Sequence, residues 1–78
     1  MPTICYIEGF RFFFFSNEGY EPHHIHIEKE NFVCKFWLTD VSLASNFGFR
    51  AVDLNKLSKL VMENRNLFLT KWNEYFNR

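Results

Sequence analysis

The hydrophobic residues of this chain change their spacing near residue 50, and that change restricts the fold more than any other feature. Before it, TICYI and FRFFFF are β-branched or aromatic runs, and HHIHIE alternates polar and apolar residues. From Asp53 onward, apolar residues recur at steps of three and four. The first pattern is typical of strands and the second of an amphipathic helix. The sequence therefore predicts an α+β fold, in which an antiparallel sheet of four to five strands carries a long C-terminal helix packed on one face.

The turn-forming residues between these runs predict where the strands and the helix begin and end. Glu8-Gly9 and Glu30-Asn31 are expected to be two-residue hairpin turns, and SNEGYEP is expected to be a loop. The strands are predicted over 3–7, 10–15, from residue 23 or 24, over 32–38, and as a short fifth strand over 41–44 that ends at Asn46 to Gly48. Asp53 is a good helix N-cap. Asn64 could divide the helix, but the apolar stripe keeps its phase across it, so one long helix is favoured over two.

A hairpin through Glu30-Asn31 would give the two faces of the sheet different chemistry, because side chains alternate along a strand. One face would be apolar and consist of Ile25, Ile27, Phe32, Cys34, Phe36 and Leu38. The other would consist of His24, His26, Glu28, Val33, Lys35 and Trp37. A helix about 10 Å wide covers one face of a four-stranded sheet about 19 Å across and leaves the other bare. Because bare aromatic faces mark interfaces, the predicted binding residues are Phe13, Phe15, Trp37 and Glu28.

Size and charge limit the classes of function. The 78 residues are expected to form a single domain, residues 1–78, whose small core makes help from a partner plausible. The net charge is zero, so there is no overall field to attract nucleic acid. No signal peptide or membrane span is expected, which places the protein in the cytoplasm with Cys5 and Cys34 as reduced thiols.

Three histidines within four residues, His23, His24 and His26, leave several interpretations open. A metal site needs a third ligand, and the same strand face offers only Glu28, so no metal or cofactor is expected. Acid–base cleavage of a phosphodiester by His24 and His26 is a second interpretation. Lys35 would stabilise the negative charge that develops in the reaction, and Trp37 would stack on a base. The third interpretation is a solvated polar strand face, on which both rings of the His-x-His pair point outward. His23 is most simply an edge residue.

Several segments together resemble a known family. MPTI, EPHHIHIE with its P-x-H-x-H core, CKFWL followed by VSLASNFGF, and MENRNLFLTKWNEYF are similar to the small bacterial family named domain of unknown function 4160. The resemblance places the family's His-x-His on His24 and His26 and its helix tryptophan on Trp72. It implies a gene in a small operon beside another short protein, and it suggests membership of a toxin–antitoxin pair.

Two functions of different classes follow. As an interaction module, the protein would bind a second copy or a cognate small protein through its aromatic sheet face. As an enzyme, it would be a metal-independent, ribonuclease-like toxin that uses His24 and His26. The neutral charge favours the first, because a small nuclease needs a basic groove for RNA.

Overall fold

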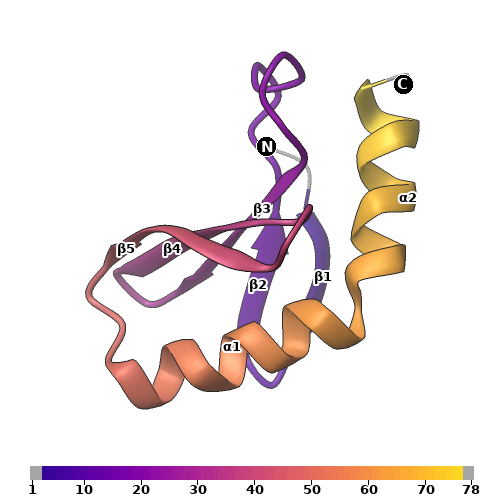
Figure 1. The fold of residues 1–78 in the computed structure, drawn as a ribbon. Helices are drawn as coiled ribbons and strands as arrows, with labels where there is room; N and C mark the ends of the chain where they lie inside the picture. Colours follow the sequence, from indigo (N-terminus) through magenta and orange to yellow (C-terminus); the bar gives the residue numbers. More distant parts are fainter. Residues whose placement is uncertain (1–2, 77–78) are drawn as a thin grey trace.

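The computed structural model describes residues 3–76, which form one antiparallel sheet and two helices (Figure 1). The spatial order of the strands follows their order in the chain. The elements are β1 (Thr3–Ile7), β2 (Phe10–Phe13), β3 (His24–Lys29), β4 (Phe32–Trp37), β5 (Ser42–Phe47), α1 (Ala51–Glu63) and α2 (Arg65–Phe76). The predicted α+β fold is confirmed, with five strands in the sheet.

Both predicted hairpin turns are present. Glu8 and Gly9 have φ values of 53° and 85° between β1 and β2, and Glu30 has a φ of 58° between β3 and β4. These left-handed residues reverse the chain with the twist that paired strands require. His26 lies opposite Lys35 and every other pair of the β3–β4 hairpin follows the predicted register, which confirms the separation into two faces.

Two strand boundaries differ from the prediction. β2 ends at Phe13 instead of residue 15, because Phe14 leaves the sheet and packs its ring against Trp72 at 5.2 Å. β5 runs over Ser42–Phe47 instead of 41–44, and pairs with β4 along its length.

The connection from β5 to α1 depends on one glycine and one asparagine. Gly48 has a φ of 102°, and a Cβ atom there would meet the Phe32 ring. The amide of Asn46 both donates to the Phe49 carbonyl at 2.9 Å and accepts from the Phe49 N–H at 3.1 Å. This turn directs Phe49, which is buried, back under the sheet.

The helical region begins two residues before the predicted N-cap. Arg50 is the N-cap residue and makes no capping bond with its side chain, so the prediction of Asp53 as N-cap is wrong. Asp53 lies instead in the first turn, where a carboxylate is favourable because of the helix dipole. There Arg50 Nε contacts Asp53 Oδ2 at 3.5 Å.

The predicted helical region is divided at Asn64 into two helices rather than one. Asn64 has φ −109° and ψ 14°, and its side-chain amide donates to the Leu60 carbonyl at 2.9 Å. Arg65 then donates hydrogen bonds to the carbonyls of Leu38 and Thr39 in the turn after β4. As Figure 1 shows, α1 crosses one face of the sheet, and α2 runs at a steep angle to α1, in the direction of the loop between β2 and β3.

The core lies between the apolar sheet face and the two helices. α1 contributes Leu57, Leu60 and Val61, and α2 contributes Phe68 and Trp72. The sheet side and its connections contribute Phe10, Phe12, Phe14, Ile25, Ile27, Cys34, Phe36, Leu38 and Phe49. Within the described residues, neither helix combines the length and the hydrophobicity needed to cross a membrane.

The second face of the sheet is not wholly bare, which corrects the prediction. The connection between β2 and β3, residues 14–23, folds over the start of β3. It buries Phe13, His24 and His26 beneath it. We call these ten residues the covering loop.

Candidate functional site

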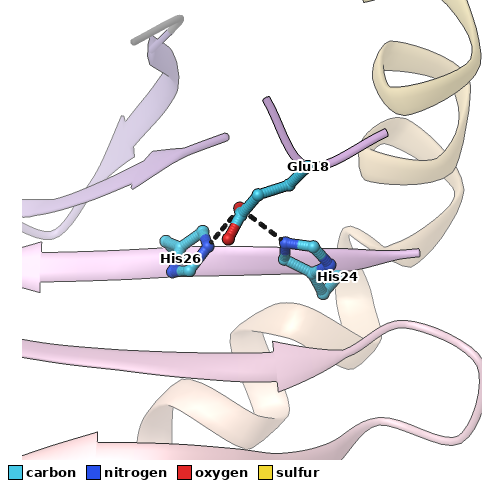
Figure 2. Close-up of side chains that lie close together, drawn as sticks. All are labelled: Glu18, His24 and His26. Carbon is cyan, nitrogen blue, oxygen red and sulfur yellow. Dashed lines mark hydrogen bonds and ion pairs between the residues drawn. The ribbon is translucent and has the colours of Figure 1, made fainter. Parts of the chain in front are cut away.

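A carboxylate from the covering loop joins two histidines of β3. Figure 2 shows Glu18 above the strand, with the rings of His24 and His26 turned toward it from either side. Glu18 Oε1 lies 2.8 Å from His24 Nε2 and 2.8 Å from His26 Nε2. The strand places both rings on one face because they are two residues apart. One oxygen atom therefore connects the loop to two positions of the sheet.

His24 is the most enclosed member of this cluster. Its side chain is 0% exposed, and its ring makes T-shaped contacts with the rings of Trp37 and Trp72, whose centroids lie 5.8 and 4.8 Å away. Its second nitrogen, Nδ1, lies 2.8 Å from the Pro22 carbonyl oxygen. A carbonyl oxygen only accepts hydrogen bonds, so Nδ1 carries a hydrogen and donates it.

His26 lies against two aromatic rings, those of Phe13 in β2 and Phe15 in the covering loop. Phe13 stacks on it at 5.4 Å with an interplanar angle of 26°, and Phe15 meets it edge-on at 4.5 Å. It lies opposite Lys35 in the register. These contacts leave its side chain 10% exposed.

Further bonds hold the covering loop against the sheet. Lys35 Nζ donates to Glu21 Oε1 at 2.7 Å and lies 4.5 Å from the centre of the Trp37 ring. The Leu38 N–H donates to the His23 carbonyl at 2.9 Å, which extends the β3–β4 pairing by one bond. The loop is thus attached to both β3 and β4 by side-chain and backbone bonds.

The protonation of the cluster follows from its contacts. Burial alone would raise the pKa of Glu18, but the hydrogen bonds to His24 and His26 outweigh it and lower that pKa below its usual value. Burial also lowers the pKa of His26, and the Glu18 carboxylate only partly offsets the effect. Near neutral pH, Glu18 is a carboxylate and His26 is neutral, so His26 donates its Nε2 hydrogen to Glu18.

The predicted orientation of the two histidines is wrong in one respect. They share a face with Lys35 and Trp37, as expected, but they do not point into solvent. A spacing of two residues along a strand determines that two side chains share a face of the sheet. It does not determine whether a loop crosses that face.

The residues that were predicted to bind a partner, and His23, lie outside the Glu18–histidine cluster. Phe13 is 2% exposed and internal, whereas Phe15 and Trp37 are half-buried at the margin of the covering loop. Glu28 lies farther along β3 and accepts from Arg11 Nη1 at 2.6 Å, so it does not join the histidines. His23, expected at the edge, lies 3.3 Å from Asn73 Oδ1 of α2.

Glu18 is the member of the site that the sequence analysis missed. The ligand atoms of Glu18, His24 and His26 all lie within 4.8 Å of one another, so the expectation that only Glu28 could complete a metal-ligating set is wrong. A signal was present: SNEGYEP, the loop predicted between neighbouring antiparallel strands, is too long for a tight hairpin and can fold back over one face. Its acidic residues were candidates for contact with polar groups there.

The arrangement is poorly suited to acid–base catalysis by two histidines. Both Nε2 atoms are directed to Glu18, and both rings are buried. A hollow of about 460 Å³ lies at the other end of β3, lined by Phe10, Lys29, Glu30, Phe32, Gly48, Phe49, Arg50 and Asp53. None of these lining residues belongs to the histidine cluster.

Together, the five-stranded meander, the bent helical pair and the His-x-His pair under a loop carboxylate describe a small α+β domain. The family model of Domain of unknown function (DUF4160) matches residues 9–73, more than half of the chain, and the protein belongs to that family. The MPTI segment precedes the match, and its first two residues lie outside those that the structure describes. No curated protein and no solved structure gives a significant match to the chain.

Proposed function

We propose that this protein is a small interaction module that binds a cognate small protein, as one component of a toxin–antitoxin-like pair. The docking surface is the part of the second sheet face that the covering loop leaves open. The observation that carries the proposal is a row of five residues across the strands, which we call the open row. It consists of Tyr6, Arg11, Glu28, Val33 and Phe47, each opposite the next in the strand register.

The open row has the composition of an interface. Tyr6 and Phe47 lie at its two ends and are each 68% exposed. Between them, Arg11 and Glu28 form an ion pair with Nη1 and Oε1 2.6 Å apart. Tyr, Phe and Arg are enriched at protein interfaces. Burying a paired charge at the centre of an interface costs less desolvation free energy than burying an isolated charge.

A protein partner agrees better with this surface than RNA does. The chain has nine basic and nine acidic residues, and the basic groups Arg11 and Lys35 on this face are already paired with Glu28 and Glu21. Binding to RNA draws on cations that neutralise phosphates. The family resemblance, which suggests a gene beside another short protein, favours a cognate partner over a second copy.

The proposal predicts that the purified chain forms a complex with the product of the gene adjacent to its own. Light scattering after size-exclusion chromatography measures the mass, and calorimetry measures Kd. Tyr6→Ser and Phe47→Ser, at the two ends of the open row, are each expected to weaken binding by about 2 kcal/mol, or about 30-fold. Met62→Ser is the matched control, because Met62 is 63% exposed but lies on α1.

Three results would contradict the proposal. The first is a chain that does not bind its neighbour at micromolar concentration, and the second is a complex that Tyr6→Ser and Phe47→Ser leave unchanged. The third is a homodimer that these two substitutions convert to monomers, because the open row would then be occupied by a second copy.

A further inference from the structure

The bonding of His24 requires a hydrogen or a metal ion between His24 and Glu18. Nδ1 holds the ring's hydrogen, because it faces the Pro22 carbonyl at 2.8 Å. In a neutral imidazole the other nitrogen, Nε2, is then an acceptor. That nitrogen faces Glu18 Oε1 at 2.8 Å, and an ionised carboxylate is also only an acceptor. Two acceptor atoms at this distance need either a hydrogen or a metal ion between them.

The surrounding atoms suit a metal ion. Two imidazole nitrogens and one carboxylate are a ligand set of zinc sites that keep a fourth position for water. The nitrogen that does not ligate a metal usually donates to a backbone carbonyl or a carboxylate, which fixes the ring's orientation. His24 already makes that bond, to Pro22.

Metal binding would require all three ligand atoms to adjust their positions. Bonds of about 2.0 to 2.1 Å at tetrahedral angles place neighbouring ligand atoms about 3.3 Å apart. The ligand atoms that lie up to 4.8 Å apart would have to approach each other through rotation of their side chains. The two contacts of 2.8 Å would open by about half an ångström. Glu18 lies on a loop, so its side chain can retreat by that amount without moving β3.

Burial and charge agree with the same interpretation. The side chain of Glu18 is 17% exposed, which gives an ion a route from solvent, whereas His24 is enclosed. A divalent ion with one carboxylate and two neutral imidazoles has a net charge of +1. Lys35 would add to it, but its Nζ is paired with Glu21 Oε1 at 2.7 Å, and that oxygen lies 4.0 Å from His24 Nδ1.

We propose that Glu18, His24 and His26 form a binding site for one divalent transition-metal ion of the Zn²⁺ type. The ligands are His24 Nε2, His26 Nε2 and a carboxylate oxygen of Glu18, and water fills the fourth position. On metal binding, the hydrogen that His26 Nε2 donates to Glu18 would move to Nδ1 of the same ring, because only a nitrogen without hydrogen can bind the ion. The proposal is independent of partner binding through the open row, because it concerns the part of the sheet face beneath the covering loop. Mg²⁺ and Ca²⁺ are not expected to bind, since they prefer all-oxygen ligand sets.

The test uses the full chain without a polyhistidine tag, treated with a chelator and then titrated with Zn²⁺. Native mass spectrometry should show one Zn²⁺ per chain, and calorimetry gives Kd. His26→Gln and Glu18→Gln should each weaken binding at least about 100-fold, because each removes one of three ligands. His23→Gln is the matched control and should bind Zn²⁺ as the parent chain does.

Folding of the variants is checked by circular dichroism, and Co²⁺ gives a second measurement through its visible absorption, which should appear with the parent chain and not with Glu18→Gln. Three results would overturn the proposal. They are a folded parent chain that takes up no Zn²⁺, His23→Gln weakening binding as much as His26→Gln, or Glu18→Gln leaving the Co²⁺ spectrum unchanged. The first result would mean that a hydrogen between His24 and Glu18, and not a metal ion, holds the cluster together.

Discussion

Cys34 lies on the apolar face of β4, which packs against the helices, and it is 1% exposed, so its thiol is protected by packing. Burial raises the pKa of Cys34 to about 12 from an ordinary value of 9.0. Burial also raises the pKa of Cys5, although Cys5 is only half-buried. Because the thiolate is the reactive form, the two thiols should differ in reactivity.

We predict that iodoacetamide at pH 8 labels Cys5 slowly and labels Cys34 only after unfolding. At a pKa of 12, about one Cys34 thiol in ten thousand is ionised at that pH. The variant Cys5→Ser isolates Cys34, and mass spectrometry should find no label in buffer and full label in guanidinium. Rapid labelling of Cys34 in the folded variant would contradict its burial.

The same shift gives the sign of a pH dependence. A folded-state pKa above the unfolded value means that folding favours the neutral thiol. The contribution of Cys34 to stability is therefore complete below pH 9.0 and is lost as the pH rises toward 12.

At the scale of elements, the bend at Asn64 is fixed by contacts outside the helices. Arg65 donates to the carbonyls of Leu38 and Thr39 and so attaches the start of α2 to the turn after β4. Leu38 is fully buried, and a buried carbonyl that loses its partner is costly.

We predict that Arg65→Met lowers the free energy of unfolding by about 1 to 3 kcal/mol, because Met fills the volume of the stem without donating. Arg50→Met is the control, since the Arg50 side chain is 79% exposed, and it should change the stability by less than about 0.5 kcal/mol. Urea titration followed by circular dichroism measures both. Equal effects would show that the bend does not depend on Arg65.

The elements that were predicted correctly are those determined by residues close together in the sequence. Alternation along HIHIE and a two-residue turn were sufficient to predict the β3–β4 register. They were not sufficient to predict the bend at Asn64, because the apolar stripe continues in phase and the cause is a bond from Arg65 to Leu38, 27 residues earlier. Glu18 was missed for the same reason, since its contacts depend on the path of a loop.

At the scale of the whole molecule, one core joins the sheet to both helices. Trp72 of α2 is 1% exposed and contacts Phe14 of the covering loop and His24 of β3, at 5.2 and 4.8 Å. Phe68 of the same helix stacks on Phe12 of β2 at 5.3 Å. α2 is therefore expected to unfold with the sheet and not separately.

We predict that Trp72→Ala costs about 3 to 5 kcal/mol, which is a large part of the 5 to 15 kcal/mol typical of a whole domain. Tyr75→Ala, on the same helix but 44% exposed, should cost less than about 1 kcal/mol. Thermal unfolding measured by circular dichroism and by tyrosine fluorescence should show one shared transition. An unchanged melting temperature for Trp72→Ala would exclude this packing.

The order of the strands also affects how fast the chain acquires its structure. Because β1 to β5 pair with their neighbours in sequence, each step of sheet formation closes a short loop at little entropic cost. We expect the hairpins to form early and independently. The contact of Trp72 with His24 joins residues 48 positions apart, so it is expected to form late, and the enclosure of His24 should accompany the slowest phase of folding.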